Sequence, residues 1–205
     1  MTATSFTPAF GTALAPADAG TTRDTRVRAR TTTRVKVLRV LLAFGFASGV
    51  AGAALLWAGS YTHDTIRDQL VAQQIQFPPA GSPGMTAEEF PGLQQYGGKL
   101  IDDGPKAKAW AEQFMAPHIL QLGGGLPYGV YSAKAFQNPQ DEQMAATSKL
   151  MAIGEVQRGL LLSAWGWWTV GTVTWTAGVV LILLGGLAFV VGAIARIRLP
   201  RVATG

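Results

Sequence analysis

Residues 159–195 read GLLLSAWGWWTVGTVTWTAGVVLILLGGLAFVVGAIA, and no charged side chain interrupts them. One helix of this length extends about 55 Å, which exceeds the roughly 30 Å hydrocarbon core of a bilayer. Two crossings would need about 40 apolar residues with a polar turn between them, and the stretch has no such turn. We therefore predict one long apolar helix that includes a single membrane span and continues beyond it.

A second apolar segment, residues 37–59, lies nearer the start of the chain and carries no charge after Arg39. Its uncharged part forms about 28 Å of helix, which also matches the hydrocarbon core. A cleaved signal peptide is the alternative, but its apolar core has about 7–15 residues and follows a short charged start. The longer segment here follows a long polar stretch, which favours an uncleaved first span.

The distribution of charge predicts the orientation of the two spans. Basic residues gather before the first span and after the second, whereas residues 60–158 carry seven basic and ten acidic side chains. Basic flanks remain on the cytoplasmic side of a membrane. We therefore expect both termini in the cytoplasm and residues 60–158 outside, which requires an even number of crossings.

The overall composition also indicates a membrane protein, because 14% of the 205 residues are charged against about 25% in soluble domains. We predict an all-α membrane protein, in which an antiparallel two-helix transmembrane hairpin carries a small helical extracytoplasmic cap. Its expected segments are a disordered basic cytoplasmic tail (1–36), a first transmembrane helix (37–59), a helical extracytoplasmic domain (60–158), a long apolar helix including the second span (159–195) and a cytoplasmic basic tail (196–205).

Basic side chains lie directly beside both predicted spans. Near an anionic membrane surface each such side chain contributes about 1 kcal/mol of binding. Because an apolar span follows the first cluster at once, we favour anionic lipid over nucleic acid as its partner. The side chains expected at the lipid surface are Arg34, Lys36, Arg39, Arg196 and Arg198.

Glycine recurs at intervals of seven residues in both apolar segments. Within a helix glycine costs about 1 kcal/mol against alanine, but in membranes small residues let two helix backbones approach closely. A seven-residue period keeps one narrow seam facing a partner helix. One glycine stripe alone is explained by the frequency of glycine in membrane helices, whereas two matching stripes favour a seam. The predicted seam consists of Gly45, Gly52, Gly59, Gly171, Gly178, Gly185 and Gly192.

Antiparallel packing fixes a register for this seam if Arg39 and Arg196 mark the same membrane edge. The expected neighbours are Gly45 with Gly192, Gly52 with Gly185, and Gly59 with Gly178.

The same register leaves residues 159–174 above the hydrocarbon core, although this stretch is very apolar. Tryptophan is frequent at membrane interfaces, which accounts for the aromatic residues but not for three successive leucines. The leucines must pack on the external domain or on another protein. The residues expected at this contact are Leu160, Leu161, Leu162, Trp165, Trp167 and Trp168.

Turn and capping signals divide the external domain into about three helices. Thr62–Gln76 has apolar residues at helical spacing and continues the first span. Thr86–Glu89 has the pattern of a capping box and opens a short helix. Gly104–Pro105 starts a helix with proline at its first position, and Pro117 ends or kinks that helix. Asn138 is the expected cap of the last helix, which leads into the second span.

No combination of side chains predicts catalysis, a metal ion or a cofactor. The chain has no cysteine, which excludes a disulfide framework, a thiolate nucleophile and cysteine-ligated zinc or iron–sulfur sites. His63 and His118 lack ligand spacing, so we expect a hydrogen-bonded interfacial histidine and a loop or helix-end histidine. Asp102 and Asp103 are adjacent and point in different directions, which indicates solvent-facing residues. We therefore predict that the protein is not an enzyme.

Three stretches of the sequence carry a resemblance to known proteins. They read YTHDTIRDQLVAQQIQFP (61–78), FPGLQQYGGKLIDDGPKAKAWAEQFMAPHI (90–119) and GEVQRGLLLSAWGWWTVG (154–171). They resemble a group of actinobacterial two-span membrane proteins of uncharacterised function, over roughly residues 55–185. The resemblance implies a bacterial plasma membrane and transfers no active site. Some members are labelled aromatic ring-opening dioxygenases, a label that these residues do not support because they include no metal-ligand set.

The leading functional hypothesis is a non-catalytic accessory or structural subunit of a larger bacterial membrane complex, with a respiratory, oxidising or transport role. Its expected partners are other integral membrane subunits and anionic lipid, and the surplus apolar stretch motivates it. The alternative is a free-standing membrane-anchored binding or sensing module. The external cap would then hold a ligand among Trp110, Phe114, Tyr128 and Tyr131.

Overall fold

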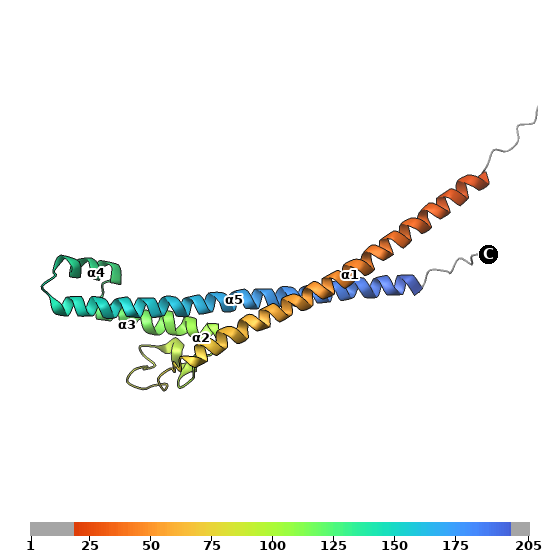
Figure 1. The fold of residues 1–205 in the computed structure, drawn as a ribbon. Helices are drawn as coiled ribbons and strands as arrows, with labels where there is room; N and C mark the ends of the chain where they lie inside the picture. Colours follow the sequence, from red (N-terminus) through yellow and green to blue (C-terminus); the bar gives the residue numbers. More distant parts are fainter. Residues whose placement is uncertain (1–18, 198–205) are drawn as a thin grey trace, which may run out of the picture. The chain divides into compact units, whose positions relative to one another are not determined.

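Two long helices, α1 (Ala19–Ala72) and α5 (Glu142–Ile197), contain most of the residues that the computed structural model describes. The described part runs from residue 19 to residue 197, with side chains from residue 32 onward. Short helices lie between the long ones along the chain (Figure 1). They are the 3₁₀-helix η1 (Pro91–Tyr96), α2 (Gly104–Ala109), the π-helical segment η2 (Trp110–Met115), α3 (Ala116–Leu122) and α4 (Tyr128–Gln137). The predicted all-α class is confirmed.

The long helices contribute to two compact units. One unit combines α1 up to Phe46 with α5 from Gly186 onward, and the other contains residues 47–185. Within the first unit, Gly192 of α5 lies beside Leu42 of α1. Within the second, His63 of α1 is hydrogen bonded to Trp168 of α5. The predicted packing of the two long helices against each other is therefore present in each unit.

Both long helices are long and apolar enough to cross a membrane. The most apolar windows have a mean hydropathy of 2.0 in residues 32–72 and 2.6 in residues 142–197. Only 17% of each window is buried within the protein, whereas the core helix of a soluble protein hides most of its apolar side chains. Most apolar side chains of these windows therefore face outward.

The start of α1 differs from the prediction. Residues 19–36 are part of the continuous helix, so the expectation of a disordered tail is wrong for this stretch. Helix formation is cooperative, and a segment that is already helical extends readily into a neighbour of moderate propensity. The remaining tail residues, 1–18 and 198–205, lie outside the described residues.

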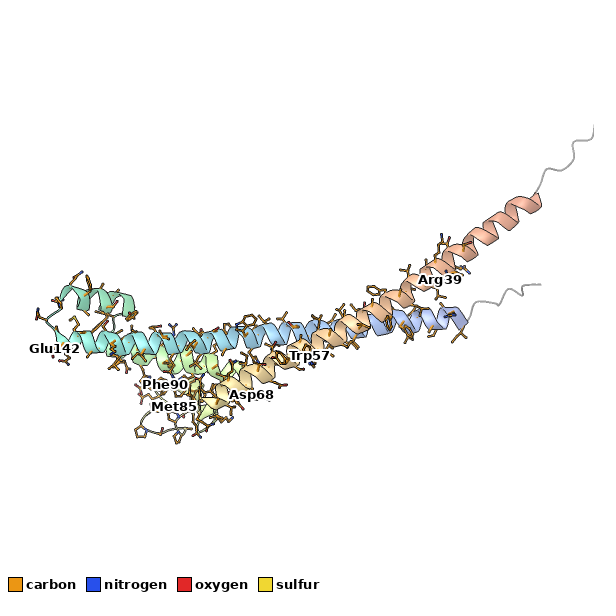
Figure 2. The ribbon with its side chains drawn as sticks, viewed as in Figure 1. Arg39, Trp57, Asp68, Met85, Phe90 and Glu142 are labelled. Carbon is orange, nitrogen blue, oxygen red and sulfur yellow. The ribbon has the colours of Figure 1, made fainter. Side chains whose placement is uncertain are left out.

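The core of the cap is built from the loop after α1 and from both long helices. Its largest fully buried side chains are Phe77, Met85, Leu93, Ile101 and Met151. The first four of these pack in one cluster with Leu70 of α1 and Leu161 of α5. Met85 and Phe90 lie together there (Figure 2). Because the cluster includes residues of α1 and α5, the cap and the long helices of this unit form one core.

Helix α1 ends at Ala72, earlier than the predicted end at Gln76. Gln74 adopts a left-handed conformation with φ of 53°, and Gln76 then pairs with Leu100 in an antiparallel bridge. The backbone N–H of Phe77 donates to the carbonyl of Lys99 at 2.9 Å. The early end of the helix thus directs Phe77 into the cap core.

The short helix predicted at Thr86 forms further along the chain. The Thr86 hydroxyl accepts a hydrogen bond from the N–H of Glu89 at 3.2 Å, as the capping pattern predicts. The helix itself, η1, begins at Pro91. Proline suits the first helical turn because its missing N–H has no partner there in any case.

The helix predicted at Gly104–Pro105 is confirmed, and Asp103 caps it by accepting from the N–H of Lys106 at 2.8 Å. Pro117 does not end this helical run, which continues through η2 and α3. Proline has no N–H for the preceding turn, and a wider π-helical turn accommodates that loss. In this turn the N–H of Ala116 donates to the carbonyl of Ala111.

Helix α4 was not predicted, and it changes the role of Asn138. Asn138 is the C-cap of α4, and its side-chain amide donates to the carbonyl of Lys134 at 2.9 Å. The cap of α5 is Asp141, whose carboxylate accepts from the N–H of Met144 at 2.8 Å. The prediction that Asn138 caps the last helix is therefore wrong. Asp141, three residues further along the chain, lies directly before that helix and caps it instead.

Candidate functional site

The seven glycines of the predicted seam are all buried. A β-carbon added to Gly52 would lie 2.8 Å from the carbonyl oxygen of Gly178 and 2.7 Å from Cγ1 of Ile182. One added to Gly59 would lie 2.8 Å from the carbonyl oxygen of Gly171. These separations are too short for any side chain, so glycine permits the close approach of α1 and α5 here.

The register of this contact differs from the prediction by about one helical turn. The predicted neighbour of Gly52 is Gly185, but its observed neighbours are Gly178 and Ile182. The observed neighbours are Gly171 and Trp175 for Gly59, and Leu41 and Leu42 for Gly192. The long side chain of an arginine can reach a membrane surface from backbone positions that differ by about one helical turn. Arg39 and Arg196 therefore define the register of the two helices only to within about one turn.

His63 lies at the end of the glycine contacts and joins α1 to α5. Its Nε2 donates to the carbonyl of Trp168 and to the hydroxyl of Thr172, both at 3.1 Å. Its ring stacks on the indole of Trp168, with centroids 4.3 Å apart. Among the described residues, no group of three or more His, Asp or Glu side chains is arranged to hold a metal ion.

Two tryptophans of α5 contact basic side chains from other helices. The guanidinium of Arg67 on α1 lies 5.9 Å from the ring centroid of Trp168. The ammonium of Lys108 on α2 lies 4.1 Å from the centroid of Trp165. Such cation–π contacts attract the cation to the ring face, so both tryptophans hold neighbouring helices against α5.

Asp102 and Asp103 surround the ammonium of Lys106, each at 2.5 Å. Their side chains are partly buried, which corrects the expectation of two solvent-facing residues. The hydrogen bond from Lys106 lowers the pKa of Asp102 below its ordinary value of 3.8, although burial opposes this shift. Burial lowers the pKa of Lys106, but the hydrogen bonds to both carboxylates outweigh it and raise that pKa above 10.5. The cluster fixes the start of α2.

The six residues predicted to contact the external domain or another protein divide into two groups. Leu161 is buried, Leu162 packs on the cap core, and Trp165 and Trp168 contact basic residues of the same unit. Leu160 and Trp167 are instead 65% and 59% exposed. The predicted contact is therefore filled by the cap on one side of α5, and on the other side the described residues leave it uncovered.

The uncovered side of α5 contains further apolar residues, of which sequence analysis did not single out Ile153 and Val170. Ile153, Val156 and Val170 are each at least half exposed. We define the α5 outer face as the set Ile153, Val156, Leu160, Trp167 and Val170. A spacing of seven residues from Ile153 to Leu160 to Trp167 is visible in the sequence, but only the placement of the cap shows which side of the helix stays open.

A groove between α1 and α5 adjoins this face, and two of the five face residues, Leu160 and Trp167, line it. It has a volume of about 320 Å³, and α1 contributes Ile66, Gln69, Leu70 and Gln73 to its lining. From α5 come Gln157, Leu160, Leu161, Ser163, Ala164 and Trp167. The lining combines apolar side chains with neutral amides and a hydroxyl, and it includes no charged residue.

The residues considered for a ligand pocket do not form one site. Trp110 and Phe114 stack on each other at 4.2 Å, and Phe114 also lies 4.5 Å from the ring of His118. His118 donates from Nδ1 to the carbonyl of Phe114 at 2.6 Å, and it lies within α3 rather than in a loop or at a helix end. Tyr131 lies on α4.

Tyr128 lines a separate cleft of about 420 Å³, and Glu112, Glu155 and Arg158 supply the charged groups of its lining. Arg158 donates to Glu155 at 2.8 Å, and no described residue provides a hydrogen-bond partner for its buried Nε.

The basic residues predicted to bind anionic lipid are exposed where the structure describes them. These are Arg34, Lys36 and Arg39 on α1 and Arg196 on α5; Arg39 is labelled in Figure 2. Arg198 lies outside the described residues.

Comparison of the chain with protein-family models, with curated proteins and with solved structures gives no match.

Proposed function

We propose that the protein is a non-catalytic structural subunit of a larger complex in the bacterial plasma membrane, and that another integral membrane chain covers the α5 outer face. The chain crosses the membrane twice, with both termini in the cytoplasm and residues 60–158 outside. The basic residues beside both apolar segments support this orientation, and the resemblance to actinobacterial two-span membrane proteins supports the location.

The low burial of both apolar windows supports membrane insertion. Only 17% of each is covered by the protein, and in water this would leave a far larger apolar patch than soluble monomers expose. Lipid is the solvent that such helices fit. Arg34, Lys36, Arg39 and Arg196 would then lie at the anionic cytoplasmic surface.

The α5 outer face is the observation that carries the proposal of a protein partner. Trp168, beside this face, is level with His63, and the charged residues Asp64, Arg67 and Asp68 follow on α1. Charged residues are costly within hydrocarbon, so this part of α1 and the neighbouring residues of α5 lie outside the lipid core. An apolar face there is covered by neither lipid nor the cap, and a partner protein would cover it.

The ionisable side chains near the α1–α5 contact have structural roles, which supports a non-catalytic function. His63 holds Trp168 and Thr172, Lys106 holds both aspartates before α2, and Arg67 donates to the carbonyl of Asp102 at 3.4 Å.

Native mass spectrometry after extraction in mild detergent tests this proposal. We expect a particle heavier than the 21.6 kDa chain that contains at least one further integral membrane chain. A solitary 21.6 kDa species, recovered reproducibly from its native membrane, would overturn the proposal.

A second candidate function, a membrane-anchored binding or sensing module, is supported by the cleft beside Tyr128. In the described part of the chain the buried Nε of Arg158 has no hydrogen-bond partner, and a carboxylate ligand would supply one. A thermal-shift screen with small mono- and dicarboxylates tests this function. Stabilisation by one of them that disappears in R158Q would support it, and no stabilisation by any would exclude carboxylates as ligands.

A further inference from the structure

We infer that the chain covering the α5 outer face is a second copy of this protein, paired through α5 in a parallel dimer with two-fold symmetry. This inference rests on the proposed function, because it names the partner of the same face. Its basis is the combined pattern of spacing, charge and exposed area on α5 between residues 150 and 170.

The residues of the outer face follow the heptad pattern of a coiled coil. Ile153, Leu160 and Trp167 recur at intervals of seven, and Val156, Ser163 and Val170 recur at the same interval three positions later. These are the a and d positions that face a partner helix. The described residues leave the apolar members of this stripe at least half exposed, so packing within this part of the chain does not account for the heptad pattern.

The opposite side of α5 packs on the cap, so the outer face stays accessible. Met151 and Leu161 are buried, and Leu162 packs on the cap core. In the heptad of Ile153 and Leu160, these three residues occupy the outer positions b, c and f. The helix therefore has one side for its own cap and the opposite side for a partner.

Membrane insertion fixes the direction of the partner helix when that partner is a second copy. Two copies inserted with the same orientation can be related by a two-fold axis along the membrane normal. Their α5 helices are then parallel and in register. In that arrangement each a residue faces its own copy, and each d residue does likewise. A stripe of apolar residues can pack against the same stripe of a second copy in this symmetry.

The absence of charge along the face also favours a second copy. A two-fold axis places every residue opposite or near its own copy, so a charged side chain on the face would meet the same charge. The positions flanking the stripe are neutral and mostly small: Ala152, Gln157, Gly159, Ala164 and Gly166. The nearest charged residue at a d position is Lys149, seven residues before Val156, and it lies beyond the N-terminal end of the face.

The size and shape of the face suit a dimer contact. Its five side chains are at least half exposed and extend over about 26 Å of helix. A standard interface buries about 800 Å² per partner, and the flanking residues of α5 extend the contact beyond these five side chains. Among the described residues, nothing lies within 4 Å of a β-carbon added to Gly159 or Gly166, so both glycines leave room for a partner.

Cysteine crosslinking in native membranes tests the dimer. The chain has no native cysteine, so L160C introduces a single thiol at an a position. Two such thiols in a parallel coiled coil lie within the ~7 Å between Cα atoms that a disulfide needs. We expect oxidation to give a species of twice the 21.6 kDa chain mass. The matched control is F136C on α4, which is 88% exposed and lies off the face, and which should remain monomeric.

A photoreactive maleimide attached to L160C separates this inference from the proposed function. Crosslinking of position 160 to its own copy supports the dimer. Crosslinking only to a different membrane chain overturns the dimer and supports the proposed function. Absence of any protein crosslink overturns both.

A charge substitution supplies an independent measurement on the full chain. L160E should lower the dimer fraction at least tenfold in sedimentation at fixed detergent concentration, because the two-fold brings the carboxylates together. Leu160 is 65% exposed, so the monomer should keep its unfolding temperature. F136E should leave the dimer fraction unchanged. A dimer that persists in L160E would overturn the inference.

Discussion

The imidazole of His63 and the indole of Trp168 stack with centroids 4.3 Å apart at the point where the glycine contacts of α1 and α5 end. A β-carbon added to Gly171 would lie 2.9 Å from Cδ2 of His63, so this glycine provides the space for the imidazole. Trp168 also packs on Gly104 at the start of α2. One aromatic pair therefore connects both long helices with the cap.

Removal of the His63 ring should destabilise this unit in two separable steps. H63F keeps a ring over Trp168 but loses the donor to Trp168 and Thr172, which should cost about 1 kcal/mol. H63A also loses the ring stack and should cost roughly 1 kcal/mol more. Denaturant unfolding in detergent micelles measures both variants. Equal stability of H63F and H63A would show that the stack contributes nothing.

Two glycines three positions apart on α1 should respond differently to alanine. At Gly52 the new methyl group would meet the carbonyl of Gly178, so G52A should lower the free energy of unfolding by about 1–3 kcal/mol. At Gly49 it would meet nothing within 4 Å. G49A should therefore be neutral or stabilise the helix by up to about 1 kcal/mol. Equal effects of the two substitutions would contradict the observed contact.

The register of α1 and α5 can be measured by disulfide formation between paired cysteines. Gly52 lies beside Ile182, so the G52C/I182C pair should crosslink rapidly on mild oxidation. The G52C/G185C pair, which matches the register expected from the arginines, should crosslink far more slowly. Gel mobility under non-reducing conditions compares the two rates, and the reverse order would restore the arginine-based register.

The Lys106 cluster, which consists of Lys106, Asp102 and Asp103, should make the stability of the cap depend on pH. Its contribution to the free energy of unfolding should be constant at intermediate pH and should fall in acid and in alkali. The pKa of Asp102 is lowered in the folded state, so its contribution is present above pH 3.8 and is lost as the pH falls through the folded value. The pKa of Lys106 is raised, so its contribution is present below pH 10.5 and is lost as the pH rises through the folded value.

Thermal unfolding from pH 2 to pH 11 measures this dependence. K106M should lower the unfolding temperature at intermediate pH and weaken its fall in acid and in alkali. K134M, which removes an exposed lysine of α4, should change neither. A profile of K106M parallel to that of the unmodified protein would refute the role of the cluster.

The proposed topology is testable with single cysteines at Ser82 and Thr204. An impermeant maleimide should label position 82 in intact cells and position 204 only after permeabilisation, because in the proposed topology the basic flanks would keep both ends of the chain inside. Labelling of position 204 in intact cells would contradict two crossings.

Long-range features of the fold were predictable from patterns that persist over many residues. The uninterrupted apolar run indicated that α5 is one helix, and the proline after Gly104 marked the start of α2 correctly. Local capping signals were less decisive, because several polar residues near one helix start compete. Asp141 rather than Asn138 caps α5, and Thr86 makes a capping hydrogen bond although the helix η1 begins only at Pro91.

The candidate site was predictable only in part because exposure depends on the cap. The sequence showed that Leu160, Leu161 and Leu162 exceed the needs of a membrane span. It did not show that Leu161 enters the cap core while Leu160 stays exposed, since neighbours on a helix point about 100° apart. That division depends on the placement of the cap against one side of α5.

The π-helical segment η2 determines the rotational phase of the helical run from Gly104 to Leu122. In an uninterrupted α-helix, Ala107 and Ile119 would point about 120° apart. One extra residue in a turn removes about 100° of this difference, and both residues are buried in the structure. Deletion of a single residue from Trp110–Met115 would therefore make the helix more regular and yet rotate Ile119 away from its contact at Gly154.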